Sequence, residues 1–114
     1  MLFFWVLTMS IVFLNGEYLP QEQAKISPMD RGFLFGDGIY EVVPTYQGEA
    51  VGFIPHIERM QSGLASIGIQ LDYTVEDWQK IIQTLIAKNE SGNRGIYLHV
   101  SRGTDTKRAH AYPT

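Results

Sequence analysis

The side chains best suited to chemistry fall into three groups along the 114-residue chain. Tyr40 follows a turn rich in glycine and aspartate, and its phenol can both donate and accept hydrogen bonds. His56 and Arg59 are three residues apart, so on a helix they share one face. Arg108 and His110 stand two residues apart near the carboxyl end. Arginine suits phosphate binding, and an Arg-x-His pair can receive a carboxylate through two converging donors.

Each of these residues also has an ordinary structural explanation. A tyrosine in a strand is usually a half-buried aromatic residue, and an arginine on a helix is usually a solvated charge or an ion-pair partner. The functional interpretation of Tyr40 therefore depends on the turn before it, Asp30-Arg-Gly-Phe-Leu-Phe-Gly-Asp-Gly38. Glycine lets the backbone pass where side chains cannot, so such a turn can bring Tyr40 to the lip of a pocket.

Composition excludes several classes of protein. Apolar residues make up 45% and charged residues 18% of the chain, as in an ordinary globular domain. The net charge of −3 gives no reason to expect nucleic acid or an anionic membrane as a partner. The absence of cysteine excludes a disulfide scaffold and a cysteine nucleophile, and the three scattered histidines predict no metal site. A cytoplasmic location is the default expectation.

Residues 1–10 form an apolar leader, and residues 11–114 form one domain. The apolar run ends at Asn15, short of the ~20 residues that a membrane-spanning helix needs, and it lacks the basic start of a signal peptide. We expect translation to start at Met9, with residues 1–8 as an upstream extension. An extra strand or a partner-binding tail stays open as the alternative.

Turn signals and hydrophobic periodicity predict an α+β domain. The expected elements are strands 11–14 and 17–19 around Asn15-Gly16, a strand 39–46 that turns at Gln47-Gly48 into a weaker strand 50–53, a helix from Pro55 to Gly68, a helix capped by Thr74, and a strand 95–101. Strands joined by tight turns imply a mostly antiparallel sheet with the two helices packed on it.

Within strand 39–46 the alternation of side chains places Tyr40 and Val42 on one face and Glu41 on the other. Glu41 is therefore expected to play a structural part. Pro44 has no backbone N–H to donate, which predicts that this strand lies at a sheet edge or is bulged there.

The segment from Asp30 to Val43 resembles the signature of fold-type IV pyridoxal-phosphate enzymes, and it is most similar to that of D-amino-acid aminotransferases. The element order over residues 11–114 resembles the small amino-terminal domain of that family. The resemblance implies pyridoxal 5'-phosphate as cofactor, an amino acid and a 2-oxo acid as substrates, and a homodimer. Tyr40 would line the substrate pocket, with Val42 on the same side.

Two further motifs carry the resemblance. His56-Ile-Glu-Arg-Met60 is similar to a His-x-x-Arg-Leu element whose arginine holds the cofactor phosphate, which implies that role for Arg59 and a place near the site for His56. Arg108 and His110 match a pair that binds the substrate carboxylate and reaches into the neighbouring subunit. Ala109 departs from the family pattern, in which an acidic residue often stands between them.

The resemblance also implies what this chain lacks. None of the lysines, Lys25, Lys80, Lys88 and Lys107, matches the Schiff-base lysine, which belongs to a second, larger domain. No catalytic residue is therefore expected in this chain, and the isolated fragment should be inactive. The rival interpretations are an aminodeoxychorismate lyase or a branched-chain aminotransferase of the same fold, which generally lack the Arg-x-His pair, and a non-enzymatic α+β module that binds a partner.

Overall fold

The computed structural model describes residues 2–6, 11–89, 95–105 and 110–111. In chain order these residues form β1 Leu2–Val6, β2 Ile11–Leu14, β3 Glu17–Pro20, the 3-10 turn η1 Gln21–Gln23, α1 Arg31–Phe35, β4 Gly38–Tyr46, β5 Glu49–Ala50, α2 Phe53–Ser66, α3 Val75–Lys88 and β6 Gly95–Ser101. The predicted class is confirmed, since all strand pairs in this part of the chain are antiparallel and two long helices accompany them.

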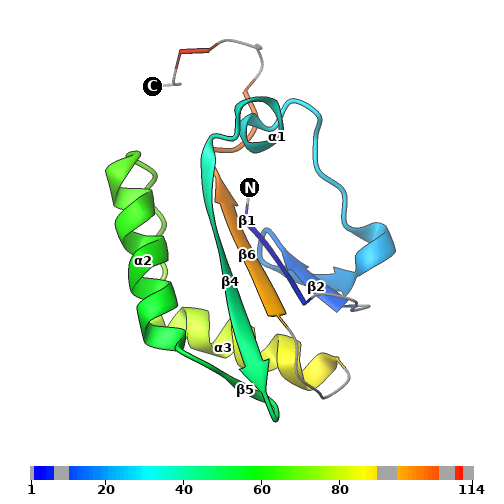
Figure 1. Cartoon of the computed structure of the whole chain (residues 1–114). Helices are drawn as coiled ribbons and strands as arrows, with labels where there is room; N and C mark the ends of the chain where they lie inside the picture. The colour runs from blue at the N-terminus through cyan, green and yellow to red at the C-terminus, as the bar shows by residue number, and fades with distance from the viewer. Residues whose placement is uncertain (1, 7–10, 90–94, 106–109, 112–114) are drawn as a thin grey trace.

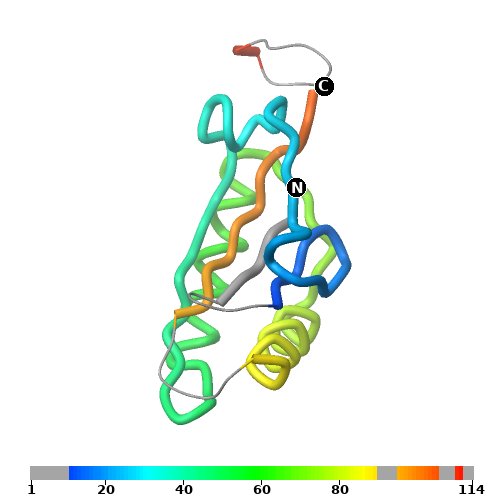
Figure 2. The backbone as a smooth tube through the Cα atoms, turned by 90° about the vertical axis from the view of Figure 1, so that its right-hand side faces the viewer, coloured from blue at the N-terminus to red at the C-terminus, as the bar shows by residue number. Residues whose placement is uncertain are grey.

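The strands make one sheet in the order β3-β2-β1-β6-β4-β5. Helix α2 packs on β4, and α3 packs on β1 and β2, so both helices cover the same face (Figures 1 and 2). Of the described helices, only the short α1 lies against the other face of β4 and β6, at its end near His99. Of the described strands only β5 lies outside β4, and it pairs with just the last two residues of β4. As predicted, β4 is an edge strand over most of its length.

The core lies between the helices and the covered face of the sheet. Every second residue of β6 from Ile96 to Val100 is buried, which is the period of a strand with one face covered. Helix α2 contributes a buried stripe at the expected helical spacing. The fully or almost fully buried members from the helices are Ile57, Met60, Leu64, Trp78, Ile81, Ile82 and Leu85.

Local sequence signals explain two of the connections. Asn15 and Gly16 both have positive φ, 49° and 91°, which is the requirement of the predicted type I′ hairpin turn. At the start of α3 the Thr74 hydroxyl accepts from the Asp77 N–H at 3.1 Å, while the Asp77 carboxylate accepts from the Thr74 N–H at 2.9 Å. This capping box satisfies two backbone donors and confirms Thr74 as the cap.

The second hairpin was predicted too long. β5 ends at Ala50, and α2 begins at Phe53 rather than at Pro55. Gly52 adopts the left-handed conformation, with φ at 66°, which ends the extended strand. Pro55 then falls in the first turn of α2, where a missing N–H breaks no helical hydrogen bond.

The leader contributes a strand. Leu2–Val6 pairs with β2 on one side and with β6 on the other. This arrangement corresponds to the extra strand that the sequence left open as an alternative. The expected start at Met9 concerns translation, which the fold does not test, and it stays a prediction.

Candidate functional site

The site begins at the turn between α1 and β4. The Asp30 side chain caps α1 by accepting from the Gly32 N–H at 2.8 Å, and Gly36 ends the helix in the left-handed conformation, with φ at 63°. A Cβ on Gly38 would lie 2.6 Å from the Val100 carbonyl oxygen, so only glycine lets β4 start this close to β6. Sequence reasoning saw a glycine-rich turn here and missed the short helix α1.

β4 presents Tyr40 and Val42 on the face opposite the two long helices. Tyr40 and Val42 are 63% and 40% exposed, whereas Glu41 between them is 5% exposed. The predicted alternation along this strand is therefore confirmed. Tyr40 and Val42 are placed where a ligand or another part of a larger protein can reach them.

Two residues of β6 lie beside Tyr40, and sequence reasoning did not select either of them. Tyr97 stacks on Tyr40 with ring centroids 5.8 Å apart, and the hydroxyl of Tyr97 shares a hydrogen bond of 2.9 Å with Nδ1 of His99. His99 also stands directly across from Tyr40 in the sheet register. The alternation of β6, which the sequence shows, places Tyr97 and His99 on one face. Only the pairing of β6 with β4, which the sequence does not show, brings them beside Tyr40.

Burial shapes the protonation of this pair. It lowers the pKa of His99, only partly opposed by the Asp30 carboxylate, and it raises the pKa of the Tyr97 phenol. Neutral imidazole and neutral phenol are therefore both favoured. Tyr97 and His99 also line a mostly apolar hollow of about 450 Å³, together with Ile26, Pro28 and Phe33.

On the helix-covered face, Glu41 holds both predicted residues of α2. Arg59 donates to the Glu41 carboxylate through Nε and through Nη2, the latter at 2.7 Å. His56 Nδ1 lies 3.0 Å from the same carboxylate. His56 and Arg59 therefore share a face of α2, as their spacing predicts.

Electrostatics favours the charged form of this pairing. The hydrogen bond from Arg59 lowers the pKa of Glu41 despite the opposing effect of burial, and His56 adds to the lowering. The side chain of Arg59 is 71% exposed although its partner is buried. Guanidinium carries five N–H donors, and two of them bond to Glu41. The other N–H groups stay available to receive an anion such as a phosphate.

The carboxyl-terminal pair is only partly described. Arg108 lies outside the described residues. His110 is exposed, and its described contacts are with α1: its carbonyl oxygen accepts from Arg31 Nη2 at 3.3 Å, and its ring lies 4.7 Å from the ring of Phe35. The structure thus brings His56 and Arg59 together on Glu41 and places Tyr40 one residue away, while His110 lies beside α1.

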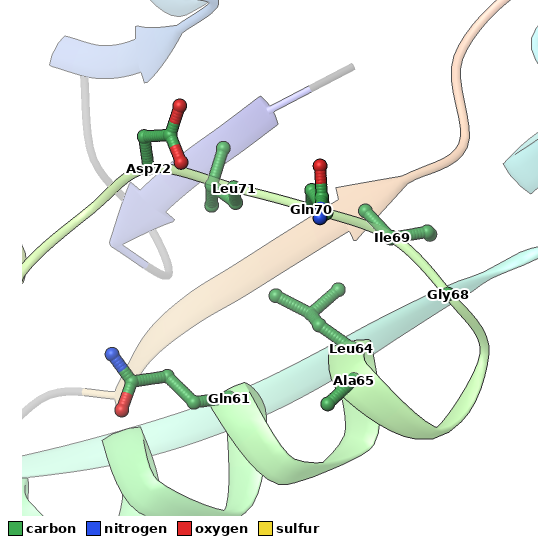
Figure 3. A pocket seen from close by; sticks show the side chains of 8 residues that line it. All are labelled: Gln61, Leu64, Ala65, Gly68, Ile69, Gln70, Leu71 and Asp72. Atoms are coloured by element: carbon green, nitrogen blue, oxygen red, sulfur yellow. The ribbon is translucent and has the colours of Figure 1, made fainter.

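A larger hollow than the one beside Tyr97 and His99 lies elsewhere. It has a volume of about 710 Å³ and lies between α2 and the segment 68–72 that follows it (Figure 3). None of the predicted site residues lines it. We therefore assign the site to the edge of β4.

The described part of the chain offers neither a metal-binding cluster nor a membrane-spanning helix. It holds no group of three or more histidine, cysteine, aspartate or glutamate side chains that could bind a metal ion. Nor does any helix there have the length and apolar character needed to cross a membrane.

Known proteins are similar in sequence to this chain. A family model described as amino-transferase class IV matches residues 38–114. The D-alanine aminotransferase of Staphylococcus epidermidis is 41% identical over 106 residues, which cover 93% of this chain and 37% of that protein. The D-alanine aminotransferase of Listeria monocytogenes is 34% identical over 102 residues, 90% of this chain and 35% of that protein. The chain thus spans little more than a third of the length of these relatives.

Solved structures share the fold. The 4-amino-4-deoxychorismate lyase from Pseudomonas aeruginosa superposes with a TM-score of 0.67 at 25% identity, over 97% of this chain and 35% of that one. The branched-chain amino acid aminotransferase from Escherichia coli gives a TM-score of 0.73 at 17% identity, over 89% of this chain and 33% of that one. One fold therefore serves enzymes with different names, and the side chains of the site have to decide among them.

Proposed function

The chain belongs to the class IV amino-transferase family, and we propose on that basis that it is the amino-terminal part of a pyridoxal-phosphate-dependent D-amino-acid aminotransferase. The substrates of the whole protein would be a D-amino acid and a 2-oxo acid. The names of its relatives from Staphylococcus epidermidis and Listeria monocytogenes support this choice of substrate class. A cytoplasmic location and a homodimer belong to the same proposal.

The observation that carries the proposal is the pairing of Arg59 with Glu41. It fixes the exposed side chain of Arg59 at Glu41, which adjoins the exposed Tyr40 in β4 and lies on the opposite face of the strand. A permanent cation held in one orientation suits a phosphate monoester. The exposed phenol of Tyr40, on the other face of β4, would meet the substrate. Arg59 would hold the cofactor phosphate, with His56 supporting it through Glu41.

The remaining roles follow from position. When bound, the cofactor would supply the electron sink that allows an amino group to move between two carbon skeletons. Tyr40 and Val42 would line the substrate pocket on the face of β4 opposite the two long helices. Arg108 and His110 would bind the substrate carboxylate, by converging donors, in the pocket of the partner subunit.

The lysine that carries the cofactor would come from outside this chain. Of the lysines that the structure describes, Lys80 and Lys88 lie exposed on α3 and Lys25 lies exposed in a connecting segment. None of them stands next to Arg59 or Tyr40 in a described contact. We therefore expect the isolated 114-residue chain to be inactive.

Kinetic assays of the protein expressed from the longest reading frame that contains this chain test the proposal. Pyruvate should form from D-alanine only when 2-oxoglutarate and pyridoxal phosphate are both present, and residues 1–114 alone should give none. Pyruvate released from aminodeoxychorismate without an amino acceptor would make the protein a lyase. Activity confined to L-leucine and L-isoleucine would make it a branched-chain aminotransferase. Either result overturns the proposal.

A further inference from the structure

Asp37 is a buried carboxylate that bridges two arginines. Its side chain is 6% exposed, and its Oδ2 accepts from Arg31 Nε at 2.8 Å and from Arg102 Nε at 2.7 Å. Burial alone would raise the pKa of Asp37, but the hydrogen bonds from Arg102 and Arg31 outweigh it and lower the pKa below the usual value. A buried charge persists in a fold only when it is paired in this way.

Each arginine extends the contact to another part of the candidate site. Arg31 Nη2 donates to the carbonyl oxygen of His110 at 3.3 Å, and the Arg31 guanidinium lies 4.9 Å from the centre of the Phe35 ring, against which the His110 ring packs. Arg102 Nη2 donates to the carbonyl oxygen of Ile67 at 2.7 Å, at the end of α2. One carboxylate thus connects the segment at His110 with the end of the helix that carries Arg59.

The backbone of Asp37 is held at the same point. Its N–H donates to the Arg31 carbonyl at 3.2 Å, and its own carbonyl accepts from the Arg102 N–H at 3.0 Å. Tyr40 follows three residues later, after the close approach of Gly38 to β6. A change at Asp37 is therefore expected to move the start of β4 and the place of His110 together.

We propose that Asp37 is a positioning residue for substrate binding. It would hold Tyr40 in place for the pocket of its own subunit, and His110 in place for the pocket of the partner subunit. The proposal rests on the proposed function, since it assigns Asp37 to the substrate end of that site. Asp37 acts through Arg31 and through the start of β4, and Arg59 is held separately by Glu41. Loss of the Asp37 charge should therefore weaken the binding of both carboxylate substrates and spare the cofactor.

The test is Asp37→Asn in the full-length protein, with Asp77→Asn as the matched control. Asp77 is a carboxylate in the capping box of α3, so its loss lowers stability without touching the Asp37 contacts. For Asp37→Asn we expect the KM for the amino acid and for the 2-oxo acid to rise about tenfold or more, because a shift of ~1 Å in a positioning group can cost about 100-fold. The affinity for pyridoxal phosphate should match the wild type, and Asp77→Asn should leave both KM values unchanged.

A second readout needs no activity. The rate at which diethyl pyrocarbonate modifies His110, followed by peptide mass spectrometry, should rise in Asp37→Asn and stay constant in Asp77→Asn. Arg31→Lys keeps the charge but cannot bond to Asp37 and to the His110 carbonyl oxygen at once, as Nε and Nη2 of Arg31 do. It should raise the rate too, and it serves if Asp37→Asn does not fold. Unchanged His110 reactivity in both Asp37→Asn and Arg31→Lys would overturn the inference, as would unchanged KM values. A wild-type protein without transaminase activity would overturn the proposed function. The reactivity of His110 would then decide whether Asp37 positions His110.

Discussion

Tyr40 and Glu41 are neighbours in the chain, yet their side chains lie on opposite faces of β4. Tyr40 is 63% exposed on the face opposite the two long helices, and Glu41 is 5% exposed beneath α2. The strand β4 therefore lies between Tyr40, which is expected to meet the substrate, and the Glu41 side chain, which orients Arg59. Tyr40 and Glu41 are joined by one peptide unit. Because the rise per residue in a strand is nearly constant and successive side chains point to opposite faces, this connection fixes where each side chain lies relative to the other.

We predict that Glu41→Gln weakens the binding of pyridoxal phosphate to the full-length protein. The glutamine amide keeps the shape of the side chain but supplies neither the charge nor the second carboxylate oxygen to the Arg59 fork. We expect a roughly tenfold loss of affinity, at the lower end of the range found when partners that orient a binding group are removed. A titration with pyridoxal phosphate, followed by fluorescence, measures this affinity. Glu58→Gln, at the exposed neighbour of Arg59 on α2, should leave the affinity unchanged, and equal losses in both variants would contradict the prediction.

We predict that Tyr40→Phe lowers kcat/KM for the D-amino acid by about tenfold, the effect of one lost hydrogen bond of ~1.4 kcal/mol. Tyr46 provides the control, because it lies exposed on the same face of β4 but farther from β6 residues Tyr97 and His99. Tyr46→Phe should therefore leave kcat/KM unchanged. A Tyr40→Phe enzyme with wild-type kinetics would remove the phenol from the site.

Short-range patterns accounted for most of the fold and for part of the site. Alternation along β4 separated Tyr40 from Glu41, and the spacing of His56 and Arg59 placed both on one face of α2. Periodicity along the chain determines these relations, so a single sequence reveals them.

Relations between distant segments could not be predicted in this way. Arg102 bonds to Asp37 across 65 positions, and Tyr97 reaches Tyr40 only through the pairing of β6 with β4. Such contacts depend on the order of the strands in the sheet. The sequence around either contacting residue does not indicate that order. The helix α1 was missed because its glycines predicted a turn, while Asp30 and Gly36 cap a single short helix there.

An intact mass of the native protein would test the expected start at Met9.

We predict that Gly38→Ala destabilises the full-length protein by about 1–3 kcal/mol, the usual cost of inserting a methyl group into a filled space. The new Cβ would lie 2.6 Å from the Val100 carbonyl oxygen, so β4 or β6 has to move. Gly16→Ala is the control: its φ of 91° is strained for alanine, but no atom lies within 4 Å of the added Cβ. Urea unfolding should give the larger loss for Gly38→Ala. A midpoint equal to that of the wild type would show that β4 and β6 can part without cost.

We predict that His99 makes the protein less stable as the pH falls below about 6.5, the ordinary pKa of histidine in an unfolded chain. Burial lowers the pKa of His99 in the folded protein, so below pH 6.5 the unfolded chain binds the extra proton first and unfolding is favoured. The effect is absent above that pH and complete once the pH passes below the lowered folded value. Thermal unfolding of the wild type and of His99→Gln between pH 5 and pH 8 measures it.

The glutamine in His99→Gln keeps a group that can hydrogen-bond with Tyr97 but does not titrate in this range. Its midpoint should therefore fall less than that of the wild type between pH 7 and pH 5. Acidic groups such as Glu41, whose lowered pKa stabilises the fold at higher pH, lose their contribution only as the pH falls through that lowered value, below the usual 4.5. These acidic groups therefore do not titrate above pH 5. In that range the difference between the wild type and His99→Gln reports on His99. Parallel pH profiles for the two proteins would show that the imidazole of His99 is solvated in both folded and unfolded states.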